Sequence, residues 1–178
     1  GTADVGIVYR RNSNGSETTG YVDSNHAGDL DECRSLVGYL FTLAGGAVSW
    51  KSSKQSITAD STTEAEYVAA SEAAKEAAWM KKFIFELGVV PSIEQPITLF
   101  CDNNGAIAQA KEPRSHQKSK HIERRFHLIR EIVGRGDIAL QKIASAENVA
   151  DPFTKALPQS SFERHIDKMG LRYQTSWL

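Results

Sequence analysis

The most regular pattern of apolar positions lies in residues 61–87, where apolar side chains recur at alternating steps of four and three. This period places them in one stripe along an α-helix, and such a stripe packs against a sheet. Ser61-Thr-Thr-Glu64 has the spacing of a capping box, and Gly88 supplies the stop. We therefore predict one long helix over residues 61–87. The stripe consists of Glu66, Ala70, Ala73, Ala77, Met80, Ile84 and Leu87.

Short apolar runs bounded by turn residues predict the strands. Three of them precede the long helix, and a Gly45-Gly46 turn joins the second to the third. This order predicts a three-stranded antiparallel meander. Two further runs follow the helix. The expected strands are residues 20–27, two within residues 35–50, residues 97–102 and residues 137–144.

The remaining segments predict shorter helices. Residues 103–110 follow a strand directly, and residues 118–133 carry an apolar stripe at helical spacing that ends at Gly134. Asp151-Pro152 has the composition of a helix start, and residues 158–178 form a tail that we expect to contain a helical turn or two. Strands and helices in this order predict a mixed α/β domain.

Length and composition narrow the class of protein. A chain of 178 residues with 40% hydrophobic and 24% charged residues is long enough for one domain and too apolar to be disordered. The longest apolar stretch, residues 39–50, is interrupted by Gly45-Gly46 and is too short for the ~20 residues of a membrane helix. Cys33 and Cys101 are too few for a disulfide framework, which predicts a reducing intracellular compartment. Because the chain starts at Gly1 without Met, we expect a piece of a longer protein.

The net charge of −1 conceals a local excess of positive charge. Residues 111–135 contain eight basic and three acidic residues, a net charge of +5. Such a segment predicts contact with a polyanion such as nucleic acid, although a solvated helix face has the same composition. Charge alone does not decide between these interpretations.

Two acidic residues lie where apolar residues are expected. Asp23 interrupts an apolar strand, so it needs a partner or a cation unless the strand is an exposed edge or a bulge. Glu64 and Glu66 lie about 200° apart on the predicted helix. Glu64 belongs to the capping box, and Glu66 therefore faces the sheet, unless it is a first-turn acid that extends to water.

Two more acidic residues follow the apolar runs. Asp102 ends a strand, at the edge of the sheet where α/β proteins bind ligands, but Asp102-Asn-Asn-Gly105 also has the composition of a simple turn. Asp151 before Pro152 has the composition of an N-cap. Four carboxylates converge only around a divalent cation, because like charges oppose joint ionisation. Oxygen ligands favour Mg²⁺ or Mn²⁺, and a pair of such ions supports phosphodiester hydrolysis.

Six motifs occur in a characteristic order along the chain. They are Tyr21-Val-Asp23-Ser-Asn-His-Ala-Gly-Asp29, Val48-Ser-Trp50-Lys-Ser-Ser-Lys-Gln55, Ser61-Thr-Thr-Glu-Ala-Glu66-Tyr-Val-Ala69, Cys101-Asp102-Asn-Asn, Lys120-His-Ile-Glu-Arg-Arg-Phe-His127-Leu-Ile-Arg-Glu131 and Ala150-Asp151-Pro-Phe-Thr-Lys155. Together they resemble the ribonuclease H domain at the C-terminus of the Pol polyproteins of copia-type (Ty1/copia) LTR retrotransposons. The resemblance covers residues 1–158 as the ribonuclease H domain, and residues 159–178 look like a partly helical tail at the end of such a polyprotein. It implies a ribonuclease H-like α/β fold with a five-stranded mixed sheet, its first three strands antiparallel, flanked by helices.

The resemblance also implies an activity. Asp23, Glu66, Asp102 and Asp151 would bind two Mg²⁺ ions, for which Mn²⁺ would substitute. The enzyme would cut the RNA strand of RNA–DNA hybrids during reverse transcription and leave 5′-phosphate and 3′-hydroxyl ends. Its partners would be the hybrid and the reverse transcriptase domain of the same polyprotein, without a membrane. Its location would be intracellular, in a cytoplasmic virus-like particle or the nucleus.

Substrate contacts are expected from polar residues beside the acids, which would read 2′-hydroxyl groups, and from the basic segment, which would hold phosphates. Turn formation and helix capping are the alternative roles for the polar residues. Cellular ribonucleases H place a His in a loop before the last carboxylate, and residues 145–150 contain none, so assistance by His in product release is in doubt here. We interpret His26, His121 and His127 as groups that form hydrogen bonds or contact phosphates, and a structural role is favoured over a functional one. The expected substrate contacts are Ser24, Asn25, Gln55, Asn103, Asn104, Lys120, Arg124 and Arg125.

Three other classes of protein are compatible with parts of this pattern. Transposases and integrases carry their acids in the order Asp, Asp, Glu, which differs from the order found here. A non-catalytic tether domain would lack the acids. A host-domesticated nucleic-acid-binding protein could retain all four without retaining the activity.

Overall fold

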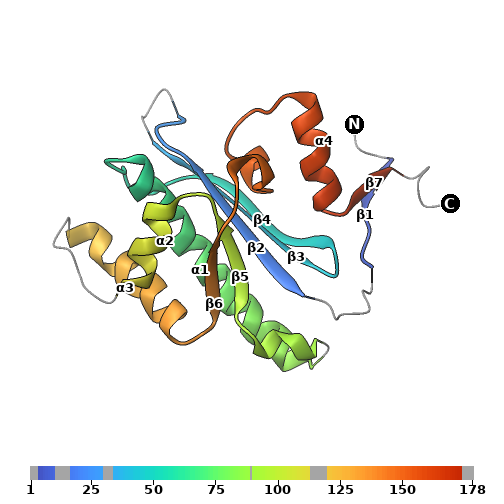
Figure 1. The fold of residues 1–178 in the computed structure, drawn as a ribbon, viewed down its shortest axis with the longest axis horizontal. Coiled ribbons are helices and arrows are strands. Elements are labelled where there is room, and N and C mark those ends of the chain that lie inside the picture. Colours follow the sequence, from blue (N-terminus) through green and yellow to red (C-terminus); the bar gives the residue numbers. More distant parts are fainter. Residues whose placement is uncertain (1–3, 11–16, 30–33, 89, 113–119, 174–178) are drawn as a thin grey trace.

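A five-stranded mixed sheet forms the centre of the molecule (Figure 1). The computed structural model describes residues 4–10, 17–29, 34–88, 90–112 and 120–173, and for residues 120–126 it describes the backbone alone. The strand order is β4-β3-β2-β5-β6, with β2, β3 and β4 antiparallel and β5 and β6 parallel to β2. This arrangement confirms the predicted sheet. The strands are β2 (Thr18–Asn25), β3 (Leu36–Leu43), β4 (Gly46–Lys54), β5 (Ile97–Cys101) and β6 (Ile138–Lys142).

A tight turn joins β3 to β4. Its two central residues, Ala44 and Gly45, both have positive φ, of 53° and 77°. Hairpins favour this geometry because it matches the twist of the strands, and Gly45 adopts it without a steric penalty. The turn therefore lies one residue earlier than predicted, and Gly46 is the first residue of β4.

The long helix α1 (Thr62–Leu87) packs on the sheet as predicted. Ser61 is its N-cap and accepts a hydrogen bond from the amide of Glu64, and Gly88 ends it with a φ of 65°. Several alanines of its buried face are fully buried, so the helix axis approaches the sheet closely. This close approach brings the first turns of α1 to the end of β2.

Two more helices complete the main core on the side of the sheet that α1 covers (Figure 1). They are α2 (Asn104–Lys111), which begins directly after β5, and α3 (Lys120–Gly134). Short 3₁₀ turns η1 (Pro91–Glu94) and η2 (Ser145–Glu147) lie in the connections. Among the described residues, no helix combines the length and apolar character that crossing a bilayer requires.

The helix predicted to begin at Asp151 is only a single 3₁₀ turn, η3 (Asp151–Phe153). The tail contains a separate helix, α4 (Gln159–Lys168), which begins after Pro158. Because a proline disfavours helix in the residue before it, Pro158 separates α4 from η3.

The C-terminal residues pack on the opposite face of the sheet from α1. β7 (Leu171–Tyr173) pairs antiparallel with β1 (Val5–Ile7), so the two ends of the described chain lie side by side (Figure 1). Met169 is buried in a second apolar cluster with Leu40 and Ala47. Residues 159–173 therefore contribute to the packing of the sheet. They also pack near η3, because Phe153 lies against the same apolar cluster as Met169.

Candidate active site

Four carboxylates from four different elements meet at one edge of the sheet. Asp23 lies near the end of β2, Asp102 directly follows β5, Glu66 lies in the first turns of α1, and Asp151 opens η3. Carboxylate oxygens of Asp23, Asp102 and Asp151 lie within 4.8 Å of one another, and a Glu66 oxygen lies within 4.8 Å of an Asp102 oxygen. The structure thus brings together all four acids that the sequence singled out.

Three of these carboxylates are almost completely buried, with residue exposures of 2% for Asp23, 4% for Glu66 and 5% for Asp151. Burial raises the pKa of Asp23 to about 6 and the pKa of Glu66 to about 8. The negative charges of the neighbouring carboxylates add to both shifts. A divalent cation would reverse this effect, because it favours the ionised form of every acid around it.

Hydrogen bonds from neighbouring residues fix the orientation of two of the acids. The amide of Ser24 donates to Glu66 Oε1 at 3.2 Å, and the hydroxyl of Thr154 donates to Asp23 Oδ2. The side chain of Asn148 donates to the carbonyl oxygen of Val22 at 2.9 Å, which ties the approach to η3 to β2. These contacts hold two segments, far apart in the chain, at a fixed separation.

The donor atoms of the cluster suit a hard divalent cation. All four acids supply oxygen, and Asp151 Oδ1 is buried without a hydrogen-bond partner among the described residues. Mg²⁺ and Mn²⁺ prefer such ligands. Cys101 Sγ lies 3.9 Å from Glu66 Oε2, and burial raises the pKa of this thiol to about 12, so the thiol is protonated in the cation-free protein. The acidic cluster is therefore compatible with metal binding.

The structure decides against the capping role that the sequence left open for Asp151. The N-cap of η3 is Ala150, and no side chain caps this turn. After Asp102, it is Asn103 that caps α2, because its Oδ1 accepts from the amide of Ala106 at 3.0 Å.

The two glutamates of α1 have different surroundings. Glu64 is half-buried, and its Oε2 accepts from the amide of Asp60 at 2.6 Å, one residue before the N-cap predicted as its partner. Glu66 is buried against β2 and faces the cluster. The capping role of Glu64 and the sheet-facing position of Glu66 agree with the sequence prediction.

Substituting each glutamate by Gln should separate these roles. Glu64→Gln should lower the free energy of unfolding by about 0.5–1 kcal/mol, through its capping contact, and leave unchanged the activity that the sequence resemblance implies, cleavage of an RNA–DNA hybrid. Glu66→Gln should remove that implied activity and leave the fold intact. Thermal unfolding and hybrid cleavage of both variants measure this. Loss of cleavage in Glu64→Gln together with survival in Glu66→Gln would reverse the assignment.

The expected substrate contacts differ in their surroundings. Asn104 is exposed, Asn25 is half-buried, and Ser24 is half-buried with its hydroxyl oxygen buried. Gln55 is fully buried, and its Nε2 donates to the carbonyl oxygen of Ala65 at 2.8 Å, so it supports the start of α1 and has no surface from which to touch a substrate. Asn103 is occupied as the cap of α2. The side chains of Lys120, Arg124 and Arg125 lie outside the described part of the structure, as does that of His121.

The other two histidines singled out in the sequence lie on different parts of the fold. His26 follows β2, and its Nδ1 lies 3.4 Å from Ser35 Oγ. His127 is exposed on α3.

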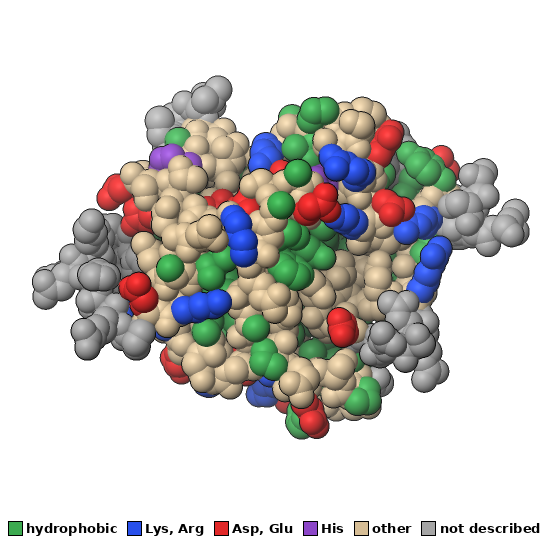
Figure 2. All heavy atoms as spheres, viewed as in Figure 1, with side chains coloured by type: hydrophobic (Ala, Val, Ile, Leu, Met, Phe, Trp, Pro, Cys, Tyr) green, Lys and Arg blue, Asp and Glu red, His purple; other side chains and the backbone are tan. Residues whose placement is uncertain are grey.

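On the face that Figure 2 shows, the acidic and basic side chains of the described residues are interspersed.

Sequence reasoning missed two residues of the site, Thr154 and Lys155. Lys155 Nζ lies 3.0 Å from Asp151 Oδ2 and 4.0 Å from Asp23 Oδ2. Both residues follow Asp151 at a spacing of three and four, which places them on its side of a helical turn. That spacing was the available signal.

Comparison with known proteins gives relatives that include several Pol polyproteins of transposons. The chain is 43% identical over 152 residues to a retrovirus-related Pol polyprotein of transposon TNT 1-94 from Nicotiana tabacum, a match that covers 85% of the chain and 11% of the polyprotein. It is 33% identical over 171 residues to the Pol polyprotein of transposon RE2 from Arabidopsis thaliana, covering 96% of the chain and 12% of the relative. The chain therefore spans about a tenth of the length of these relatives. No model of a protein family matches the sequence.

Solved structures with a similar fold are ribonucleases H. LC11-RNase H1, isolated from compost, superimposes with a TM-score of 0.57 at 17% identity, covering 85% of this chain and 96% of that one. The same protein in complex with an RNA/DNA hybrid gives a TM-score of 0.55 at 16% identity, covering 78% and 94%. RNase H1 from Halobacterium salinarum NRC-1 gives 0.53 at 19% identity, covering 76% and 92%. These similarities concern the fold.

Proposed function

The chain belongs to the Pol polyproteins of Ty1/copia-type retrotransposons and has the ribonuclease H fold, and on this basis we propose that it hydrolyses the RNA strand of RNA–DNA hybrids during reverse transcription. Family and fold agree with the sequence prediction. The observation that carries the proposal is the convergence of Asp23, Glu66, Asp102 and Asp151 from four elements, mostly buried and with oxygen atoms a few ångströms apart. Such a cluster is unfavourable without a cation.

Asp23, Glu66, Asp102 and Asp151 would hold two Mg²⁺ ions, with Mn²⁺ as a substitute. Bound cations of this kind activate a water for attack on a phosphodiester and stabilise the leaving 3′ oxygen, which gives 5′-phosphate and 3′-hydroxyl ends. The residues of this chain supply the orientation: the Ser24 amide holds Glu66, and the Thr154 hydroxyl holds Asp23. Because both acids are already fixed, little reorganisation is needed on binding.

Substrate recognition would use the polar groups around the cluster. Asn104 is exposed at the start of α2, and Ser24 and Asn25 lie at the end of β2. From these positions beside the acids, they would contact 2′-hydroxyl groups of the RNA strand. Lys120, Arg124 and Arg125, on the basic segment, would hold phosphates. The reverse transcriptase domain of the same polyprotein is the proposed partner, and an intracellular virus-like particle the proposed location.

The test is cleavage of a labelled RNA–DNA hybrid by the purified chain with Mg²⁺, with Mn²⁺ and with a chelator, beside double-stranded RNA and DNA. We expect cation-dependent cutting confined to the RNA of the hybrid. Thermal unfolding with and without the cation serves as the control for a folded chain with occupied sites, since a bound ligand raises the midpoint. A folded, cation-stabilised chain that leaves the hybrid intact even when the matching reverse transcriptase domain is added would contradict the proposal.

A further inference from the structure

A lysine ammonium group reaches into the carboxylate cluster. Lys155 Nζ lies between two acids, 3.0 Å from Asp151 Oδ2 and 4.0 Å from Asp23 Oδ2. The side chain of Lys155 is 41% exposed, whereas those of Asp151 and Asp23 are 8% and 3% exposed. The half-exposed ammonium group of Lys155 thus lies between the solvent and two almost fully buried carboxylates.

The local backbone accounts for this position. The amide of Lys155 donates to the carbonyl oxygen of Asp151 at 3.2 Å, which places the two side chains on one side of a helical turn. Thr154, one residue earlier, binds Asp23 through its hydroxyl and lies 3.1 Å from the Asp151 carbonyl oxygen. A second lysine at this edge, Lys142, donates to the backbone carbonyl oxygen of Asp102 rather than to its carboxylate.

We infer that Lys155 is an internal counter-ion of the carboxylate cluster, which neutralises Asp23 and Asp151 in the cation-free protein and which a divalent cation displaces when it binds. This inference rests on the proposed function only in assuming that the cluster takes up a divalent cation. Two buried carboxylates need a compensating positive charge, and the Lys155 ammonium group supplies it. Because the lysine side chain is flexible and half-exposed, it can move away when another cation binds. The same positive charge opposes a cation at the same oxygens. Lys155 therefore stabilises the empty site and weakens its affinity for the ion.

The experiment compares Lys155→Met with the wild-type chain by calorimetric titration of Mg²⁺ and Mn²⁺ and by thermal unfolding with and without the ion. Without the ion, the variant should unfold at a lower temperature, because Asp23 and Asp151 lose their counter-charge. With the ion, its affinity should be about tenfold higher, and its rise in melting temperature larger than that of the wild type. A purely structural lysine would lower stability in both conditions and would not raise the affinity.

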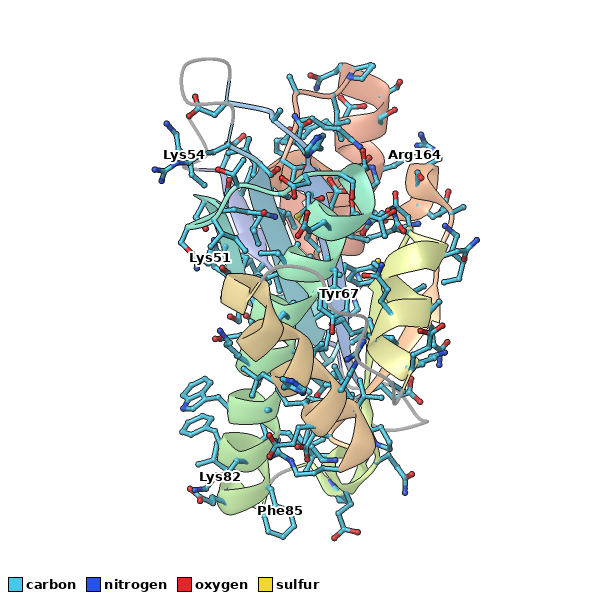
Figure 3. The ribbon with its side chains drawn as sticks, turned by 90° about the vertical axis from the view of Figure 1, so that its left-hand side faces the viewer. Lys51, Lys54, Tyr67, Lys82, Phe85 and Arg164 are labelled. Atoms are coloured by element: carbon cyan, nitrogen blue, oxygen red, sulfur yellow. The ribbon has the colours of Figure 1, made fainter. Side chains whose placement is uncertain are left out.

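Lys51→Met is the matched control. Lys51 lies on β4 (Figure 3) with a similar side-chain exposure, 44%, and its Nζ lies 3.2 Å from Glu72 Oε2, a carboxylate that is not part of the cluster. This variant should bind the ion with wild-type affinity. Lys155→Arg keeps the positive charge and should stay at or below wild-type affinity.

A second measurement covers the case in which Lys155→Met does not fold. In the wild-type chain with ¹³C-methylated lysines, the signal of Lys155, assigned as the one missing from Lys155→Arg, should move on addition of Mg²⁺ while that of Lys51 stays. Unchanged or weaker affinity in Lys155→Met, or an unmoved signal, would overturn the inference. Binding is measured without substrate, so a wild-type chain that binds the ion but fails to cut the hybrid contradicts only the proposed function.

Discussion

Asp102→Asn should abolish cleavage of the RNA–DNA hybrid and at the same time raise the melting temperature of the cation-free protein. Asp102 has oxygens close to Asp23 and Asp151 on one side and to Glu66 on the other, so it links both parts of the cluster. Its negative charge contributes to the raised pKa values of Asp23 and Glu66, which means that it destabilises their ionised forms. The side-chain amide in Asp102→Asn would have the same shape as the carboxylate but no charge. It would therefore remove the repulsion of Asp23 and Glu66 and, at the same time, one charged ligand of the cation.

The expected loss of cleavage is about 10³-fold or more, the size found when a group acting on developing charge is removed. Single-turnover cleavage with Mg²⁺ and thermal unfolding in chelator measure the two effects. Asp137→Asn is the control, because Asp137 pairs with Arg135 at 2.9 Å in a surface turn and should affect stability by less than about 1 kcal/mol and cleavage not at all. Wild-type cleavage by Asp102→Asn would show that the site is wrongly assigned.

The parts of the fold that could be predicted are those in which neighbouring residues decide the structure. The helix over residues 61–87 carries its own cap, stripe and stop, and so its ends and the opposite roles of Glu64 and Glu66 follow from spacing alone. The β2–β3–β4 meander has the same local character. Asp23 and Glu66 could be singled out because acids at apolar positions are costly, whatever the fold, whereas the assignment of Asp102 and Asp151 depended on the resemblance to ribonuclease H.

The parts that could not be predicted depend on contacts between residues far apart in the chain. The pairing of β1 with β7 joins three-residue strands from the two ends of the chain, too short to carry a pattern. Gln55 looks like a polar loop residue in the sequence, but tertiary packing buries it beneath α1. Asp151 has the composition of a cap, and only the docking of η3 on the sheet shows that it faces Asp23.

The docking of η3 depends on the absence of a side chain at Gly38. Gly38 on β3 lies directly opposite Asp23 in the antiparallel register. A Cβ at this position would lie 2.7 Å from Thr154 Cγ2, 2.8 Å from Phe153 Cβ and 3.1 Å from the carbonyl oxygen of Ala150. Because these close contacts come from both ends of η3, the whole turn must move to admit a methyl group. The acid and the hydroxyl that this turn carries would move with it.

Gly38→Ala should therefore lower both stability and cleavage. Overpacking of this kind costs about 1–3 kcal/mol of unfolding free energy, and a displacement of about 1 Å at a catalytic group costs about 10²-fold in rate. Chemical denaturation and single-turnover hybrid cleavage measure these two losses. Gly134→Ala is the matched control: a Cβ there meets nothing within 4 Å, so cleavage should stay at the wild-type rate.

Combining Gly38→Ala with Thr154→Ser should separate crowding from other effects of the methyl group. The Ser side chain keeps the hydroxyl that binds Asp23 but lacks the Cγ2 atom nearest to the new methyl group. If η3 is displaced by crowding, the double variant should recover part of the lost stability and rate, so that the two substitutions are not additive. Wild-type stability and cleavage in Gly38→Ala would mean instead that the position of η3 does not depend on this close approach, and that hydrogen bonds such as those of Asn148 and Thr154 are enough to hold Asp151 beside Asp23.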